Sequence, residues 1–247
     1  MPDYDFSAPR LYLDAALAND GEIALSPEQS NYLRNVLRLG AGDAVLVFNG
    51  RDGEWRADIS EAGKKKTVLT ARQQMRPQTP PGDLWYLFAP LKHARLDYMV
   101  QKAVEMGASR LQPVMTHRTQ ATRVNTERMH ANAVEAAEQC GLLALPETAE
   151  PTPLGKLLDA WPDGRTLIFC DEGAETSDSL GVLGGLARGP LAVLIGPEGG
   201  FDEAERSRLL KLPFVTAISL GPRILRADTA AVAALALVQA VLGDFNS

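Results

Sequence analysis

The chain has 247 residues, of which 45% are hydrophobic and 23% charged, and its formal net charge at pH 7 is −6. This length allows one large domain or two of ordinary size, and the composition is that of a globular protein. No apolar run is long enough to cross a bilayer, and the acidic start, residues 1–5, lacks the regions of a signal peptide. We therefore expect a cytoplasmic protein with no membrane partner.

Metal-binding side chains are few and scattered. Cys140 and Cys170 are isolated and fit no metal-ligand spacing, which is typical of a reducing compartment. The three histidines, His93, His117 and His130, do not cluster with the cysteines. We expect no bound metal.

The acidic net charge is unevenly distributed along the chain. Residues 76–125 carry seven basic and three acidic side chains, whereas residues 126–247 carry nine basic and seventeen acidic ones. Binding of phosphate groups needs a local positive surface, not a basic chain as a whole. The middle segment supplies such a surface, so nucleic acid is not excluded as a partner.

The first 75 residues are expected to form a small β-barrel with one helix. Ser26 is followed by Pro27 and Gln29, which is the pattern of a capping box with proline at the first helical position. The helix is predicted to run over residues 27–39. The predicted strands are 10–13, 22–25, 43–48, 54–59 and 67–71, bounded by turn residues.

A proline-rich linker, residues 76–83, precedes a different pattern. Apolar strands there alternate with amphipathic helices, which predicts an α/β domain over residues 84–247, with a parallel sheet covered by helices on both faces. The predicted strands are 84–89, 110–115, 166–170, 191–195 and 214–220, and the predicted helices are 94–106, 125–140, 202–211 and 227–242.

Two of these strands end in turns that contain a Gly-Pro pair, at 196–200 and 221–226. Ligands of parallel sheets bind outside the carboxyl ends of the strands, and glycine lets the backbone approach a ligand closely. Either turn alone is compatible with an ordinary strand-to-helix connection. Two such turns, together with Glu198, Arg223 and Arg226, favour a ligand pocket.

The same two turns carry a family resemblance. LIGPEGGFDEAE (194–205) and ISLGPRILRADTA (218–230) closely resemble the signature motifs of the RsmE family. Further similar segments are NYLRNVLRL (31–39), QKAVEMG (101–107) and EQCGL (138–142), the last with leucine where arginine is usual. RsmE enzymes use S-adenosylmethionine to methylate N3 of a uridine in 16S ribosomal RNA.

The resemblance implies a fold and partners. It implies a SPOUT methyltransferase domain with a trefoil knot after a PUA-like, RNA-binding barrel. It also implies a homodimer with its active sites at the subunit interface, acting on 16S ribosomal RNA in the small subunit. Two alternatives remain: a SPOUT enzyme for another RNA such as a transfer RNA, and an RNA-binding module without catalysis.

The resemblance also assigns roles to residues. Arg226 is the catalytic candidate, because a guanidinium near the uracil oxygens stabilises the negative charge left when N3 loses its proton. A structural ion pair of Arg226 with Asp228 or Glu198 is the alternative. The RNA contacts are expected at Arg10, Arg34, Arg38, Arg118 and Arg123. S-adenosylmethionine is expected to lie against Phe169, Cys170, Ile195, Gly196, Pro197, Glu198, Gly199, Gly200, Ser219, Leu220, Gly221, Ile224 and Leu225.

Overall fold

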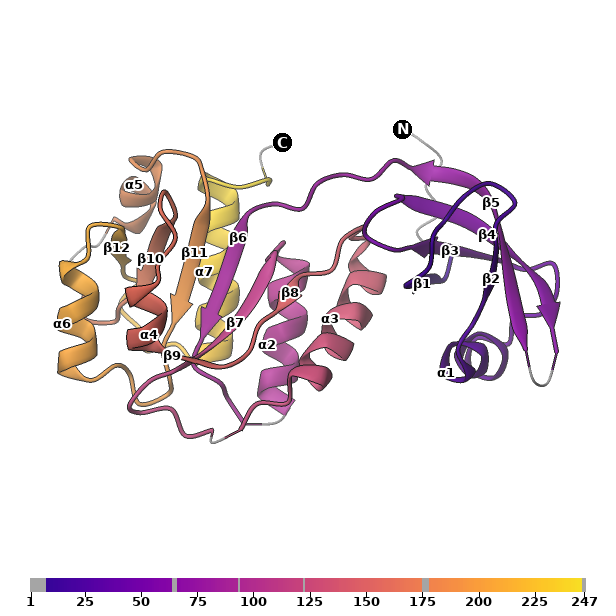
Figure 1. Cartoon of the computed structure of the whole chain (residues 1–247). Helices are drawn as coiled ribbons and strands as arrows, with labels where there is room; N and C mark the ends of the chain where they lie inside the picture. Colours follow the sequence, from indigo (N-terminus) through magenta and orange to yellow (C-terminus); the bar gives the residue numbers. More distant parts are fainter. Residues whose placement is uncertain (1–7, 64–65, 93, 122, 175–177, 246–247) are drawn as a thin grey trace. The chain divides into compact units, whose positions relative to one another are not determined.

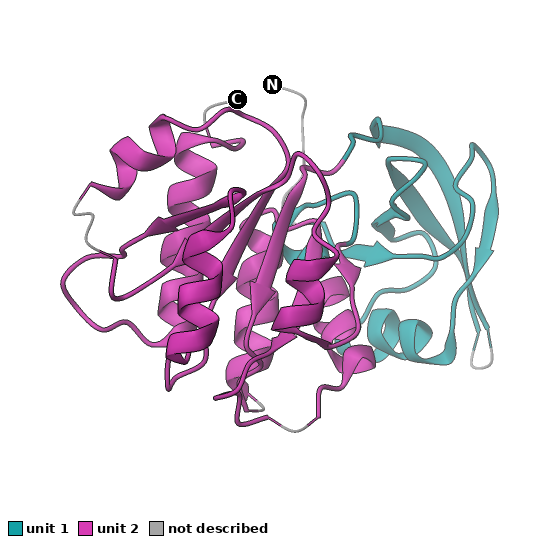
Figure 2. Ribbon diagram, turned by 60° about the vertical axis from the view of Figure 1, so that its left-hand side comes forward, with its two compact units in different colours: residues 1–80, 137–145 teal, residues 81–136, 146–247 magenta. Residues whose placement is uncertain are grey.

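The computed structural model describes residues 8–63, 66–92, 94–121, 123–174 and 178–245. The chain forms two compact units, coloured separately in Figure 2. The first contains Met1–Pro80 together with Ala137–Leu145, and the second contains Pro81–Ala136 and Pro146–Ser247. The sequence predicts a change of domain in the proline-rich segment, but nothing in it indicates that residues 137–145 belong with the first unit.

The first unit is built on a curled five-stranded sheet with the order β1-β3-β4-β5-β2. All neighbours are antiparallel except β1 and β3. Register shifts between β4 and β5 bend the ladder, as bulges do. In the described residues β1 and β2 do not pair with each other, so the sheet is curled but open. The strands are β1 (Arg10–Tyr12), β2 (Glu22–Ala24), β3 (Ala44–Phe48), β4 (Glu54–Ala62) and β5 (Thr67–Arg76).

The helix of this unit begins as predicted and ends differently. Helix α1 (Pro27–Asn31) has the expected capping box, in which the Ser26 side chain accepts from the Gln29 amide. The prediction of an α-helix to residue 39 is wrong, because a π-helical turn, η1 (Tyr32–Val36), follows α1. Arg38 then has a φ of 59°, in the left-handed region. Leu33, within this π-helical turn, is fully buried in the core. Hydrophobic spacing in the sequence does not distinguish a π-helical turn from an α-helical one.

Residues 137–145 are held in the first unit by buried ions. Arg10 Nε and Arg76 Nε bind the two carboxylate oxygens of Glu54 at 2.7 and 2.8 Å, and Glu54 is fully buried. Arg10 also donates to the carbonyls of Ala137 and Glu138, at 2.6 and 2.9 Å. These carbonyls belong to the last turn of α3 (Thr126–Cys140), where a helix leaves acceptors unpaired. The guanidinium groups of Arg10 and Arg76 thus provide the hydrogen-bond donors for the buried carboxylate of Glu54, and that of Arg10 also for the carbonyls at the end of α3.

The second unit contains a parallel sheet, as the sequence predicts. Its strand order is β12-β10-β11-β6-β7-β8, with β9 paired to the end of β7, and every pair is parallel. The short strands β8 and β9 were not predicted. The strands are β6 (Leu84–Phe88), β7 (Arg110–Met115), β8 (Glu147–Thr148), β9 (Thr152–Pro153), β10 (Thr166–Cys170), β11 (Leu191–Ile195) and β12 (Val215–Ile218).

Helices cover both faces of this sheet (Figure 1). Alternate strand residues such as Leu167 and Leu194 pack with Leu154, Leu158 and Leu209 from α4 (Leu154–Asp159) and α6 (Glu203–Lys211). On the other face α7 (Ala227–Val241) packs against β11 and against α2 (Ala94–Glu105), and α5 (Ser179–Gly184) adjoins α7. Each fully buried leucine contributes roughly 1.5–3 kcal/mol.

The strand order determines where a ligand can bind. Strand β7 follows β6 in the chain and lies on one side of it in the sheet, whereas β11, β10 and β12 lie on its other side. Strand β11 lies between β10 and β6. Parallel strands place all their carboxyl ends at one edge, and a change of direction there leaves a crevice. The turns after β10, β11 and β12 are therefore neighbours.

None of the helices in the described ranges combines the length and apolarity that a bilayer crossing requires.

Candidate cofactor and RNA-binding site

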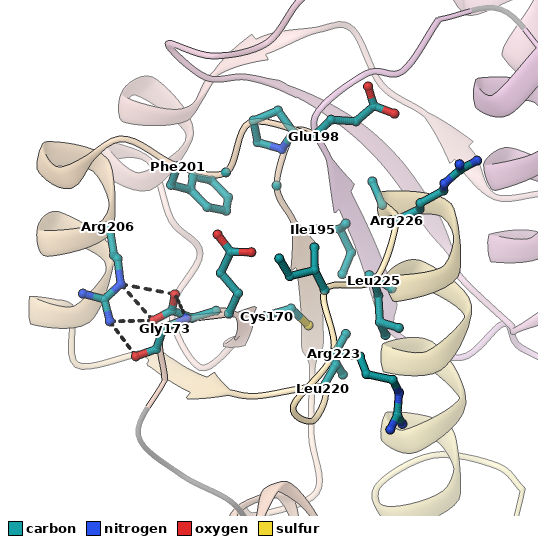
Figure 3. A pocket seen from close by; sticks show the side chains of 18 of the residues that line it. Cys170, Gly173, Ile195, Glu198, Phe201, Arg206, Leu220, Arg223, Leu225 and Arg226 are labelled. Atoms are coloured by element: carbon teal, nitrogen blue, oxygen red, sulfur yellow. Dashed lines mark hydrogen bonds and ion pairs between the residues drawn. The ribbon is translucent and has the colours of Figure 1, made fainter.

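A cavity of about 500 Å³ lies at the carboxyl ends of β10, β11 and β12 (Figure 3). Its walls come from the segments that follow these three strands and from the first turns of α6 and α7. Its lining residues are Cys170, Asp171, Glu172, Gly173, Ile195, Gly196, Pro197, Glu198, Gly200, Phe201, Glu203, Arg206, Leu220, Gly221, Arg223, Ile224, Leu225, Arg226, Ala227 and Ala230.

Most of the residues expected to hold the cofactor border this cavity. Ten of the thirteen line it, and Arg226 lies at its rim. The other three lie next to it. Phe169 is fully buried in the core, with its ring edge-on to Phe201 at 5.1 Å. The Ser219 carbonyl accepts from Ser179 Oγ at 2.5 Å, and Gly199 lies beside the side chain of Arg118.

Several lining residues were not predicted, and the most informative are at the end of β10. Asp171 is buried and accepts hydrogen bonds from Arg206 Nε, the shorter at 3.0 Å. Arg206 also donates to the Gly173 carbonyl at 3.1 Å, and the Gly173 amide donates to Asp171 at 3.1 Å. These bonds tie the β10 loop to α6. In the sequence, the polar residues directly after strand 166–170 are a sign of a ligand-binding loop. Their place at the cavity, however, follows from the strand order, which the sequence does not show.

The glycines of the β11 turn are required by their surroundings. A Cβ atom on Gly196 would lie 2.5 Å from Cε2 of Phe201, so this position has no room for a side chain. Gly200 has a φ of 68°, and its amide donates to the Pro197 carbonyl at 2.9 Å. A Cβ atom on Gly200 would lie 3.4 Å from Oε1 of Glu172, which places that carboxylate at the turn. The backbone of the turn is thus fixed in shape and open toward the cavity.

The thiol in the cavity is unreactive. Burial raises the pKa of Cys170 to about 12, so its sulfur stays protonated at neutral pH. Burial, followed by the influence of Cys170 and Asp228, raises the pKa of Tyr86 well above its usual value. Neither Cys170 nor Tyr86 therefore supplies an anionic nucleophile at neutral pH. No three histidine, cysteine or acidic side chains among the described residues lie close enough to hold a metal ion.

Arg226 and Glu198 have different surroundings. Arg226 occupies the N-cap position of α7, and its exposed side chain extends outward from the rim (Figure 3). In the described part of the chain it forms no ion pair with Asp228 or Glu198, the structural role considered as its alternative. Asp228 instead accepts from the Thr229 amide, and Glu198 pairs with Arg95. The guanidinium of Arg226 is thus available to a ligand.

The five arginines expected to contact RNA differ in burial and in the unit to which they belong. Arg10 lies in the interior of the first unit with Glu54, so we do not retain it as an RNA contact. Arg38 is exposed, whereas Arg34 is partly buried and donates to the Gly63 carbonyl at 2.7 Å. In the second unit, Arg118 donates to the Gly199 carbonyl at 2.8 Å, and Arg123 is exposed.

Comparison with known proteins shows the family of this chain. Residues 78–239 match the RNA methyltransferase domain family, and residues 25–70 match the RNA methyltransferase PUA domain family. The chain is 30% identical over 232 residues to the ribosomal RNA small subunit methyltransferase E of Rickettsia conorii, covering 93% of this chain and 94% of that protein. This chain belongs to that methyltransferase family. The Synechocystis member is 31% identical over 229 residues, covering 90% and 74% of the two chains.

Solved structures of family members have the same fold. The Neisseria gonorrhoeae ribosomal RNA small subunit methyltransferase E, bound to S-adenosylmethionine, superposes with a TM-score of 0.87 at 26% identity, covering 97% and 100% of the two chains. A Legionella pneumophila methyltransferase in complex with S-adenosylmethionine has a TM-score of 0.82 at 28% identity, covering 94% and 97%. The predicted α/β methyltransferase domain and the PUA domain are confirmed.

Proposed function

We propose that this protein transfers the methyl group of S-adenosylmethionine to N3 of one uridine in 16S ribosomal RNA, within the small subunit. The main support is the cavity, which both signature turns border. Two similar structures contain that cofactor, and the similar sequences are named for methylation of small-subunit ribosomal RNA.

The cavity suits this cofactor in size and charge. Its volume of about 500 Å³ is within the usual range of small-molecule sites. The turns at Gly196, Gly200 and Gly221 expose backbone groups to a ligand. Glu172 and Glu203 offer carboxylates to a molecule that carries a sulfonium and an ammonium group. When bound, S-adenosylmethionine supplies an electrophilic methyl group, and the role of these residues is to hold it in line with the acceptor.

Arg226 is proposed to assist the acceptor. Uridine N3 carries a proton at neutral pH and becomes a nucleophile as it loses that proton, which leaves negative charge on O2 and O4. A guanidinium near these oxygens stabilises the charge through its rigid donor fork. The position of Arg226 at the N-terminus of a fifteen-residue helix adds positive potential.

The first unit and the basic side chains are proposed to hold the RNA. Arg34 and Arg38 lie at the π-helical turn and the left-handed position after it, and Arg118 and Arg123 follow β7 in the second unit. Irregular backbone of this kind is frequent at functional sites. Positive side chains in two units suit a long RNA substrate better than a free nucleotide.

We further propose a homodimeric, cytoplasmic enzyme with a trefoil knot in its second unit, as in SPOUT enzymes. Ile224, at the cavity rim, is 90% exposed, and α7 is apolar on most sides. A helix that is apolar on most sides is covered by its own fold or by a partner, and the resemblance to SPOUT enzymes favours a second subunit. Sedimentation of the purified protein is expected to give the mass of a dimer.

Methyl transfer from labelled S-adenosylmethionine tests the function directly. The acceptors compared are purified small subunits, free 16S ribosomal RNA and bulk transfer RNA. We expect label in the small subunit, and mass spectrometry of nuclease fragments is expected to find one N3-methyluridine. Label only in transfer RNA would identify the alternative SPOUT activity. Cofactor binding in calorimetry without transfer to any RNA would contradict the enzymatic function.

A further inference from the structure

A second cavity lies on the other side of the β11 turn. Its volume is about 360 Å³, and Pro197 and Glu198 form a wall that it shares with the cofactor cavity. The opposite walls come from the segments that follow β6 and β7, so it also opens at the carboxyl edge of the sheet. We call it the basic pocket and define it by Lys92, Arg95, Arg118, Gln120, Pro197 and Glu198.

The two cavities differ in charge. Among the residues that the structure describes, the basic pocket is lined by three cations, Lys92, Arg95 and Arg118, and by one acid, Glu198. The cofactor cavity has four acids and three cations along its walls, and one of those cations, Arg206, is already bound to Asp171. An anionic group is therefore favoured in the basic pocket, and a sulfonium is favoured in the cofactor cavity.

Arg118 and Arg95 of the basic pocket are held in place before any ligand binds. Arg118 donates to the Gly199 carbonyl at 2.8 Å, which anchors it to the β11 turn. Its own turn is closed by the Thr116 amide, which donates to Thr119 Oγ1 at 2.9 Å. Arg95 binds the carboxylate of Glu198 across the pocket. Lys92 has no ion-pair partner within the described ranges, so its ammonium is available.

The start of α2 adds the positive potential of a helix N-terminus to these side chains, and the Arg95 amide there donates to the Lys92 carbonyl at 3.3 Å. This helix of twelve residues begins at Ala94, which lines the basic pocket. Helix N-termini expose unpaired amides and carry positive potential, which is a favourable setting for phosphate. Lys92 and Arg95 flank this end of the helix in sequence. A phosphate in the pocket would meet charged side chains and a helix N-terminus together.

We propose that the basic pocket binds a backbone phosphate of the RNA strand beside the target nucleotide, in competition with Glu198 for Arg95. This inference rests on the proposed function. Pro197 and Glu198 line both cavities, so the RNA strand of a base that enters the cofactor cavity over this wall would reach the basic pocket next. A phosphate contact positions the strand and carries no sequence information. Lys92 and Arg95 are thus positioning residues.

Binding of a 16S ribosomal RNA transcript over a range of salt concentrations tests the assignment. Lys92→Gln and Arg95→Gln should each lower the slope of log affinity against log salt by about 0.7–1 and weaken binding about tenfold at low salt. S-adenosylmethionine affinity should stay unchanged. The matched control is Arg188→Gln, an exposed arginine before β11 at the amino edge of the sheet, which should bind RNA like the unmodified protein.

The competition with Glu198 predicts an effect of opposite sign. Glu198→Gln should tighten RNA binding several-fold, whereas Glu203→Gln, the same charge change in the cofactor cavity, should not. Unchanged salt slopes for both cation variants would overturn the inference. So would lost cofactor affinity in Arg95→Gln, since Arg95 would then only support the β11 turn. Because RNA binding is read without methyl transfer, failure of the proposed catalytic function would be seen separately.

Discussion

Arg206 on α6 binds the buried carboxylate of Asp171 at the end of β10, with Nε and Nη2 at 3.0 and 2.9 Å. Asp171→Ala removes the acceptor and leaves the partly buried guanidinium without this partner. We expect a loss of about 1.5–3 kcal/mol in the free energy of unfolding, the usual size for hydrogen bonds to charged groups. The loop at Gly173 also loses its anchor, so cofactor affinity should fall as well.

Urea unfolding and calorimetry with S-adenosylmethionine measure the two effects. The control is Arg208→Gln on the same helix, because Arg208 pairs with the exposed Asp159 and surface pairs contribute little. That variant should stay within about 1 kcal/mol of the unmodified protein. Normal cofactor affinity in a folded Asp171→Ala protein would show that the loop is held without the ion pair.

The second prediction concerns Gly196 and Phe201. Gly196→Ala places a methyl group against the Phe201 ring and should weaken cofactor binding by displacing the β11 turn. Adding Phe201→Leu makes room, so the double variant should bind better than Gly196→Ala alone, a non-additive result expected of residues in contact. Calorimetry of the two single variants and the double variant decides this. If the effects of the two substitutions on cofactor affinity simply add, the loss in Gly196→Ala does not come from a clash with the Phe201 ring.

Gly221 provides a different test of the second turn. Its φ is 98°, and a Cβ atom there would meet nothing within 4 Å. Gly221→Val is therefore disfavoured by backbone strain and by bulk at the cavity, not by a clash in the core. We expect a folded protein, judged by its thermal unfolding, with cofactor binding lost. Undiminished affinity in the folded variant would remove this turn from the proposed cofactor site.

The fourth prediction separates catalysis from binding at Arg226. Arg226→Ala should lower turnover about a hundredfold to a thousandfold, as loss of an oxyanion-type donor does, with little change in cofactor affinity. Arg226→Lys should restore part of the rate, because lysine keeps the charge but lacks the fork. Arg223→Ala is the matched control from the same turn. Full turnover of Arg226→Ala at saturating cofactor and RNA would exclude a catalytic role.

The fifth prediction concerns pH and the first unit. Burial by itself would raise the pKa of Glu54, but hydrogen bonds from Arg76 and Arg10 outweigh it and hold the pKa below its usual value of 4.5. A depressed folded pKa contributes stability above the unfolded pKa, and this contribution is lost as pH falls through the folded pKa. Urea unfolding between neutral and acidic pH should therefore show falling stability.

Glu54→Gln tests the assignment of that pH dependence. It removes the carboxylate from the buried guanidinium of Arg10 and the partly buried guanidinium of Arg76, so we expect a loss of about 3–5 kcal/mol at pH 7. The variant should also show a flatter pH profile below about pH 5, because its side chain does not titrate. Glu61→Gln, on the same strand and exposed, is the control and should change little. An unaltered acid profile in Glu54→Gln would assign the pH dependence to another carboxylate.

Local patterns in the sequence predicted where strand β11 lies and where helix α1 begins. The run at 191–195 is apolar throughout because β11 is central and covered on two sides, so its apolar side chains alone indicate where the strand lies. The capping box at Ser26 and Gln29 likewise fixed where α1 begins. The two signature turns line one cavity, because parallel strands place their carboxyl ends at the same edge of the sheet.

Features that depend on distant residues could not be predicted. Arg10 is expected from the sequence to contact RNA, and only the fold places Glu54 and the end of α3 around it. Only the fold, likewise, brings Arg95 to its partner Glu198, which follows it by about a hundred residues. The two-residue strand β8 has too little periodicity to be recognised. Tertiary contacts, not local preference, decide such cases.

The placement of residues 137–145 in the first unit has a consequence for synthesis of the chain. When Pro80 has been made, Glu54 and Arg10 are present, but the carbonyl groups that complete their cluster are not. Sixty-five more residues must follow before Leu145 exists. At roughly 5–20 residues per second, the nascent first unit waits about 3–13 s for its last segment. The N-terminal unit thus matures only after more than half of the chain has been translated.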